Sequence, residues 1–130
     1  RRQLRRIDDN IAARTENLSL FLGGLDGSKY WTDYAVKGSS NFALPLILRE
    51  PDTDLMAKVV SLLGALGIEF RRGTAGGGNQ ARQPYLRKRG FVASDFPIAE
   101  HIHKFGLYVG NYPSLDHGMI SDLCDRLNTL

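Results

Sequence analysis

The protein has 130 residues, of which 42% are hydrophobic and 24% are charged, with a formal net charge of +3. The length is that of one ordinary domain and the composition is that of a soluble globular protein. The single cysteine and the lack of a stretch that resembles a secretory signal lead us to expect a cytoplasmic protein. The longest apolar run, Phe42 to Leu48, is too short to cross a bilayer, and the single Cys124 excludes an intramolecular disulfide.

The first predicted element is a long leading helix over residues 1–25. Gly23 and Gly24 mark its end. The opening run RRQLRR is basic, but Asp8 and Asp9 follow directly, which favours an exposed charged helix face over a nucleic-acid contact. Because the helical pattern is already under way at Arg1, we expect a larger domain to precede this chain. The apolar residues that recur at helical spacing are Leu4, Ile7, Ile11, Leu18, Leu22 and Leu25.

Residues 26–130 are predicted to form the body of the domain. Two aromatic and β-branched runs, 30–36 and 40–48, are separated by KGSS and predict a pair of antiparallel strands. A helix follows, with Asp52 or Thr53 as its N-cap and Gly67 just after its end. Residues 68–72 predict a short strand that leads into a glycine-rich loop.

The end of the chain predicts two helices with a strand between them. Asp95 is the expected cap of the first helix and Pro97 lies in its first turn. LYVGNY, residues 107–112, predicts a brief strand, and an apolar stripe indicates a last helix over residues 113–128. This order favours the α/β (α+β) class, a small, mostly antiparallel sheet covered by helices in two layers.

The stretch GTAGGGNQARQPYLRKRG, residues 73–90, contains no acidic residue. It lacks the Lys-Ser/Thr of a P-loop, and it leads into a proline instead of opening a helix as a dinucleotide fingerprint does. Its glycines allow close approach of a ligand, and Asn79, Arg82 and Gln83 offer planar donors to phosphate, sugar or base. A surface loop with solvated charges is an equally open interpretation.

Other candidate sites are weak in this sequence. His101 and His103 lie two residues apart and so face different sides of a helix, and no metal site is predicted. No Ser-His-Asp arrangement or carboxylate pair can be argued, so we expect no catalytic residue in this chain. A basic nucleic-acid-binding module, with Tyr85 stacking on bases, stays open as an alternative of another class.

Taken together, several segments resemble the C-terminal domain of the DegT/DnrJ/EryC1/StrS family of pyridoxal-phosphate-dependent sugar enzymes. The segments are QLRRIDDNIAARTENLSLFLGGL, NFALPLIL, GGGNQARQPYL and HIHKFGLYVGNYPSL. The last two are similar to the branch that removes the C3 hydroxyl of nucleotide-linked 4-keto-6-deoxyhexoses. The resemblance implies the fold of the C-terminal domain of fold type I pyridoxal-phosphate-dependent transferases.

The resemblance also implies a function. Pyridoxal phosphate (PLP) or pyridoxamine phosphate (PMP) would be bound mainly by a large domain absent from this chain, and residues 1–130 would form one C-terminal domain that binds a nucleotide-sugar. A homodimer, no nucleic acid, no membrane and a role in lipopolysaccharide or deoxysugar synthesis are expected. A sugar aminotransferase of the same family is the alternative. By carry-over, the substrate-contacting residues are Asn79, Arg82, Arg71, Gln83, Tyr85 and Tyr108.

Overall fold

The computed structural model describes residues 4–39, 41–76 and 78–130, so the expectations that involve Arg1, Arg2, Ser40 and Gly77 lie outside the described residues. The chain divides into two compact units. One comprises residues 1–44 and 110–130 and is called the helical unit. The other comprises residues 45–109 and is called the sheet unit. No helix in the described part is long and apolar enough to cross a membrane.

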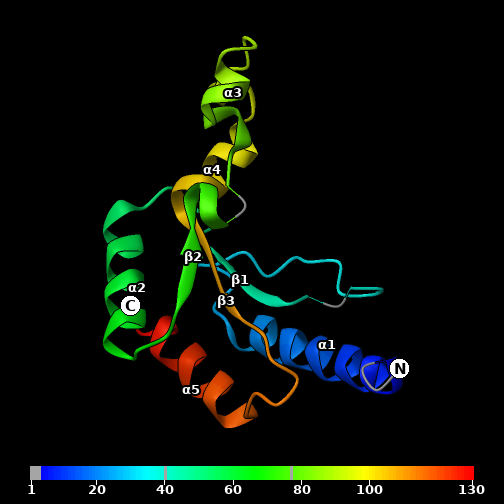
Figure 1. Ribbon diagram of the computed structural model, residues 1–130. Helices are drawn as coiled ribbons and strands as arrows, with labels where there is room; N and C mark the ends of the chain where they lie inside the picture. Colours follow the sequence, from blue (N-terminus) through cyan, green and yellow to red (C-terminus); the bar gives the residue numbers. More distant parts are fainter. Residues whose placement is uncertain (1–3, 40, 77) are drawn as a thin grey trace. The chain divides into compact units, whose positions relative to one another are not determined.

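The helical unit is built on two long helices that pack against each other (Figure 1). Helix α1 spans Ile7–Gly24 after a 3-10 turn at Leu4–Arg6, and α5 spans His117–Asn128. The Asp116 carboxylate caps α5 by accepting from the Met119 amide at 3.2 Å. Both helices are confirmed. Their buried hydrophobic side chains are Leu18, Phe21, Leu22, Ile120, Leu123, Cys124 and Leu127.

A pair of buried asparagines ties α1 to the segment before α5. The side-chain nitrogen Nδ2 of Asn17 donates to Asn111 Oδ1 at 3.0 Å and to the Tyr112 carbonyl at 2.9 Å. Asn111 Nδ2 in turn donates to the carbonyls of Arg14 and Asn41 at 3.0 and 2.9 Å. These bonds satisfy polar groups that would otherwise be costly to bury.

The predicted strand over residues 30–36 does not form: Tyr30 is an isolated β-bridge residue, and the first strand begins at Ala43. Residues 31–36 have no regular secondary structure. The reason lies in Tyr30, which is buried and donates its hydroxyl to the Leu127 carbonyl at 2.8 Å. The aromatic side chain therefore anchors the chain to the end of α5 instead of forming part of a hairpin.

A three-stranded sheet forms in the order β1-β3-β2, with β1 at Ala43–Ile47, β2 at Phe70–Arg72 and β3 at Gly106–Gly110. Strands β2 and β3 are antiparallel. Beyond the end of β1, the Leu48 amide donates to the Phe105 carbonyl at 2.9 Å. The α+β class with a small antiparallel sheet is confirmed.

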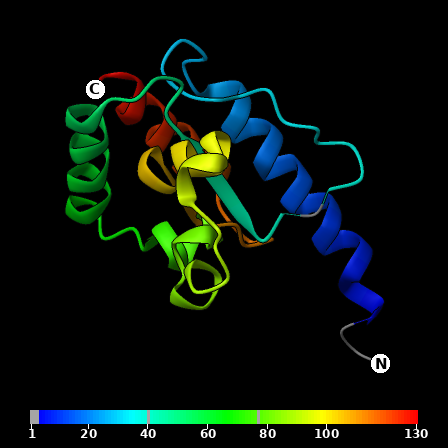
Figure 2. The ribbon, with the colours of Figure 1, turned by 90° about the horizontal axis from the view of Figure 1, so that it is seen from above.

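Helix α2, Thr53–Ala65, lies alongside the sheet in both ribbon views (Figures 1 and 2). The Asp52 carboxylate caps it by accepting from the Leu55 amide at 2.8 Å, as expected. Gly67 has a φ of 66°, the left-handed conformation that a residue just after a helix needs. Met56, Val59 and Leu63 bury the inner side of this helix.

Residues 73–96, between β2 and α4, form an excursion that we call the loop segment. It contains 3-10 turns at Gly73–Gly76, Gln80–Arg82 and Ala93–Asp95, and a short helix, α3, at Pro84–Arg87 near its tip (Figure 1). Helix α4 spans Pro97–Phe105. Asp95 is not its cap, which corrects the sequence prediction. The residue before the helix is Phe96, which makes no side-chain capping bond, because Asp95 already belongs to a 3-10 turn.

Candidate functional site

The loop segment is fastened to α4 by one carboxylate. Glu100 accepts from Arg82 Nε at 2.9 Å, and a second Arg82 nitrogen bonds to its other oxygen. Asn79 Nδ2 donates to Glu100 Oε2 at 3.0 Å, and Lys104 Nζ lies 3.2 Å from Glu100 Oε1. Two of the predicted substrate residues, Asn79 and Arg82, therefore converge on a residue that the sequence analysis did not single out.

This carboxylate is strongly stabilised in its charged form. The hydrogen bonds from Arg82 lower the pKa of Glu100 to about 2, partial burial opposes that shift, and the bonds from Asn79 and Lys104 add to it. The same pairing raises the pKa of Arg82. The cluster is thus a fixed salt link at neutral pH, and Glu100 is unsuited to accept a proton from a substrate there.

Asn79 is buried and hydrogen-bonded within the protein, whereas the sequence predicted a residue that faces a ligand. It is only 2% exposed. Its Oδ1 accepts from the Ala81 amide at 3.0 Å, and its Nδ2 also donates to the Ala93 carbonyl at 2.9 Å. Both hydrogens of its amide are therefore donated within the protein, so Asn79 closes the loop segment on itself. Its direct contact with a substrate stays a prediction.

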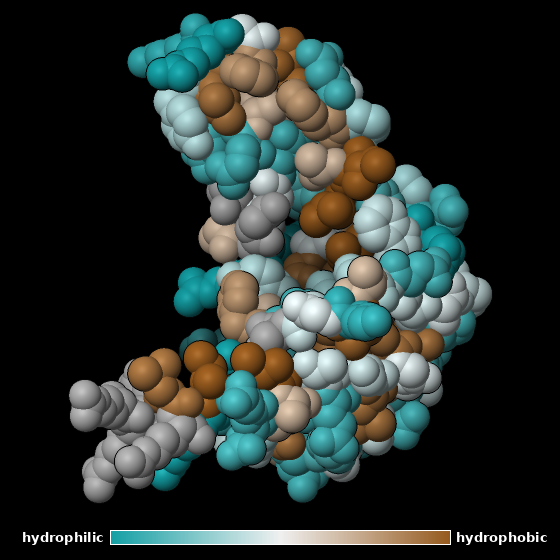
Figure 3. All heavy atoms as spheres, turned by 90° about the vertical axis from the view of Figure 1, so that its right-hand side faces the viewer, coloured by the Kyte–Doolittle hydropathy of each residue, from teal (hydrophilic) through white to brown (hydrophobic). Residues whose placement is uncertain are grey.

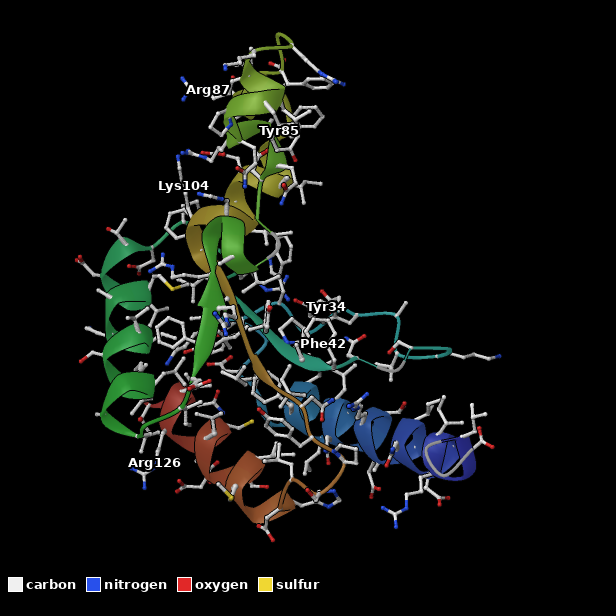
Figure 4. The ribbon with its side chains drawn as sticks, in the orientation of Figure 1. Tyr34, Phe42, Tyr85, Arg87, Lys104 and Arg126 are labelled. Carbon is white, nitrogen blue, oxygen red and sulfur yellow. The ribbon has the colours of Figure 1, made fainter. Side chains whose placement is uncertain are left out.

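A cavity of about 690 Å³, the first cavity, opens beside this cluster. Its wall combines the charged side chains of Arg82, Arg87, Lys104 and Glu100 with apolar ones. Figure 4 shows Arg87 and Lys104 on the same side of the sheet unit, with Tyr85 turned to the other side. The size and the mixed wall suit a small organic anion. The remaining lining residues are Ala81, Gly90, Phe91, Val92, Ala93 and Ser94.

The other predicted residues lie elsewhere. Arg71 and Tyr108 are directly opposite each other on β2 and β3, so they share one face of the sheet. Gln83 precedes α3, and its backbone N–H donates to the Gln80 backbone carbonyl at 2.9 Å. Tyr85, on α3, is 58% exposed. The six predicted residues therefore fall into three places and not into one site.

The outer part of the sheet unit exposes large hydrophobic side chains. Figure 3 shows this as brown surface on the lobe that carries α3. Phe91 and Phe96 stack with ring centroids 6.5 Å apart and an interplanar angle of 28°. Exposed aromatic groups beside Arg87 are the surroundings in which a flat ligand can stack. The exposed residues are Tyr85, Phe91, Val92, Phe96 and Ile98.

A second cavity, of about 480 Å³, lies where β2, the start of α2 and the end of α4 meet. Arg72 follows Arg71 on β2 and therefore points to the opposite face of the sheet. It lines this cavity with His103 and Lys104, and Arg82 borders both cavities. The resemblance predicted a substrate contact for Arg71, whereas its neighbour Arg72 lines this cavity. The other lining residues are Thr53, Met56, Ala57, Gly73 and Phe105.

The histidines and the cysteine contribute no metal site in the described part of the chain. His101 lies 2.7 Å from the Leu48 carbonyl and contacts the Phe105 ring. Cys124 is buried in the helical unit, and burial raises the pKa of its thiol to about 11. A protonated, enclosed thiol is a poor nucleophile.

No family model matches the sequence, and no curated protein matches it significantly. Solved structures do match, and they define a class, the PLP-dependent sugar-modifying enzymes of the DegT type. The resemblance predicted from the sequence is therefore confirmed, and the fold is that of part of such enzymes.

Three of these structures illustrate the match. A GDP-4-keto-6-deoxymannose-3-dehydratase with a trapped PLP-glutamate geminal diamine superposes with a TM-score of 0.79 and 25% identity over 97% of this chain. The E. coli enzyme, GDP-4-keto-6-deoxy-D-mannose-3-dehydratase with bound hydrated PLP, superposes with a TM-score of 0.79 and 24% identity over 97% of this chain. Spr1654 from Streptococcus pneumoniae is named as a sugar aminotransferase and was solved in its PMP form. It superposes with a TM-score of 0.78 and 15% identity over 98% of this chain. This chain spans about a third of those structures, 33%, 33% and 32% of their lengths.

Proposed function

We propose that this chain is the C-terminal, substrate-binding part of a PLP- or PMP-dependent nucleotide-sugar 3-dehydratase, an enzyme that removes the C3 hydroxyl of a 4-keto-6-deoxyhexose. The observation that carries the proposal is the difference between two equally good superpositions. The dehydratase and Spr1654 have TM-scores of 0.79 and 0.78, yet the dehydratase shares 25% of its residues with this chain and Spr1654 only 15%.

In this proposal, the chain does not contain the whole cofactor site. When bound, PLP or PMP supplies an electron sink for reactions at the attached carbon. Glu100 and Lys104, a carboxylate and an amine that line the first cavity, are held in the same salt link with Arg82 and are not free to contact the cofactor ring. In the proposal, the main cofactor-binding residues lie outside these 130 residues. This chain spans 33% of the length of the solved dehydratase.

What this chain contributes, in the proposal, is binding and orientation. Arg82 is 39% exposed at its side chain and borders the first cavity, while Glu100 fixes its guanidinium plane. A guanidinium held in this way can present its remaining N–H groups to a phosphate or sugar oxygen without first losing side-chain freedom. Arg87 and Phe91 extend the same wall toward the tip of the loop segment.

The proposal includes a homodimeric enzyme of the cytoplasm that serves the synthesis of deoxysugars for a bacterial surface polysaccharide. Leu4, Ile7 and Ile11, at the start of the helical unit, are 69%, 48% and 40% exposed. Apolar side chains that repeat along one side of a helix and face solvent mark a surface that another structure covers. This supports further contacts of α1 in the intact enzyme.

The test is a comparison of substrates and variants in the intact enzyme. Loss of the C3 hydroxyl from CDP- or GDP-linked 4-keto-6-deoxyhexose, followed by mass spectrometry with added PMP, is the expected activity. Arg82→Ala should lower kcat/KM by about 10- to 100-fold, the loss of one or two charge-assisted hydrogen bonds. Arg126→Ala, which removes an exposed arginine paired with Asp122 on α5, is the matched control and should leave kcat/KM unchanged.

Two results would count against the proposal. Transfer of an amino group to C4 with retention of the C3 hydroxyl would establish the aminotransferase alternative. Equal kinetics for the Arg82 and Arg126 variants would show that the loop segment does not contact the substrate.

A further inference from the structure

The second cavity of the sheet unit carries positive charge of which the proposed function uses only Arg82. Arg72, Arg82 and Lys104 line it, and none of its described lining residues is acidic. Glu100, which lies outside that lining, is shared between Arg82 and Lys104. Three cations and no carboxylate therefore appear among the described lining residues, and an anion in the cavity would reduce the mutual repulsion of the cations.

The glycine-rich loop holds His103 in place at this cavity. The Gly78 amide donates to the Gly73 carbonyl at 2.8 Å, which closes the loop beside the imidazole. A Cβ atom at Gly78 would lie 2.6 Å from His103 Nδ1 and 2.7 Å from the Gly73 carbonyl oxygen, so no side chain fits at that position. The glycine at position 78 therefore serves close packing against the histidine.

Burial and nearby charges both affect the pKa of His103. Its Nδ1 is buried and has no hydrogen-bond partner among the residues that the structure describes. Burial lowers the pKa of His103, and the positive charges of Arg82, Arg72 and Lys104 lower it further, against the opposite effect of Glu100. An anion bound in the cavity would reverse part of this shift.

We propose that Arg72, His103 and Lys104 form a binding site for a phosphate group in the second cavity. Arg72 already has a fixed orientation, because one of its terminal nitrogens donates to the Lys104 carbonyl at 2.8 Å. A guanidinium and an ammonium group in one cavity suit the several oxygens and the negative charge of phosphate. The site stands without the proposed enzyme activity, since it follows from the cavity and its charges alone.

The phosphate could belong to the diphosphate of a nucleotide or to the phosphate of PMP, and the experiment separates these sources. The protein, with its three histidines labelled with ¹³C at Cε1, is titrated with acid and base by NMR in the presence and absence of inorganic phosphate. The His103 signal is assigned by its loss in His103→Gln. We expect phosphate to raise the pKa of His103. Pyrophosphate, CDP, GDP and PMP are then compared by calorimetry at equal ionic strength.

Variants identify the residues of the site. Arg72→Gln should weaken phosphate binding by about tenfold or more, because it removes a charge-assisted donor. Arg126→Gln is the control, since Arg126 is an exposed arginine of the helical unit, and it should leave binding unchanged. If Arg72→Gln fails to fold by circular dichroism, Lys104→Gln replaces it, with the same expected loss.

Tighter binding of CDP and GDP than of PMP supports the site and assigns it to the nucleotide, and the reverse order supports it and assigns it to the cofactor. The proposal is overturned if phosphate leaves His103 unchanged, or if sodium chloride at equal ionic strength or glutamate gives the same effect. It is also overturned if Arg126→Gln weakens binding as much as Arg72→Gln. None of these outcomes depends on measured dehydratase activity, so a failure of the proposed function remains distinguishable.

Discussion

In the helical unit, α1 and α5 bury leucine and phenylalanine side chains together, whereas the loop segment buries only Ala81 among its described hydrophobic residues. The loop segment is held instead by the bonds that converge on Glu100. Burial of apolar surface is insensitive to pH and to single charges, while a polar cluster depends on each of its members. The first region can therefore tolerate changes of solution that alter the second, which is the region that lines the cavities.

The largest expected effect is in the helical unit. Phe21 is completely buried, and Phe21→Ala should lower the free energy of unfolding by about 3–5 kcal/mol, because it leaves a cavity in a packed core. Urea unfolding followed by circular dichroism measures this. Met119→Ala, at a residue of α5 that is 64% exposed, is the control and should change the free energy by less than about 1 kcal/mol. Similar losses in both variants would mean that the two helices do not form the core.

A smaller effect is expected from the buried amides of the same unit. Asn111→Ala removes partners from Asn17 and from the carbonyls of Arg14 and Asn41, and each loss leaves a polar group without compensation. The free energy of unfolding should fall by about 1–3 kcal/mol. Asn10→Ala, on α1, serves as the control, and the helix preference of alanine should make it neutral or slightly stabilising. A neutral Asn111→Ala would show that water replaces the lost partners.

The smallest effect on global stability, and the most local one, is expected at Glu100. Glu100→Gln should speed amide hydrogen exchange in residues 78–100 and leave α1 and α5 unchanged, because the glutamine lacks the charge that holds Arg82 and Lys104. The free energy of global unfolding should change by about 1 kcal/mol or less. Hydrogen exchange with mass spectrometry, corrected for intrinsic rates, measures the exchange rates of residues 78–100 and of α1 and α5 in the same experiment.

The same cluster predicts a dependence on pH. The pKa of Glu100 is lowered from 4.5 to about 2 in the folded protein, so its stabilising contribution is complete above about pH 4.5 and is lost as the pH falls toward 2. Protection of the loop segment should decrease over that range in the natural protein, and Glu100→Gln should abolish the decrease. An identical pH dependence in both proteins would assign the effect to other carboxylates.

Local signals in the sequence predicted the helices well. Asp52 and Gly67 bracket α2 as expected, because capping depends only on neighbouring residues. The strand at residues 30–36 was predicted from aromatic content, and the prediction failed because Tyr30 packs against a carbonyl 97 residues further along the chain. Asp95 failed as a cap for a local reason, the 3-10 turn that already includes it.

The candidate site was predicted in part. Glycine, amide and arginine in residues 73–90 pointed to the loop segment, and Asn79 and Arg82 do lie together there. Glu100 was missed, although its spacing of four residues from Lys104 on α4 is a signal for an ion pair. The choice between Arg71 and Arg72 required the register of β2 with β3, which a three-residue strand does not reveal by periodicity.

The close approach of α1 and α5 has a practical consequence for labelling. A Cβ atom at Gly24 would lie 3.0 Å from Cys124 Sγ, so this thiol is enclosed by the neighbouring helix, and its pKa of about 11 keeps it protonated. Maleimides and iodoacetamides, which react with exposed thiolates, should therefore leave it unmodified at neutral pH. These 130 residues contain no other cysteine, so a Tyr85→Cys variant of this chain would carry one reactive thiol on α3 for a fluorophore or spin label.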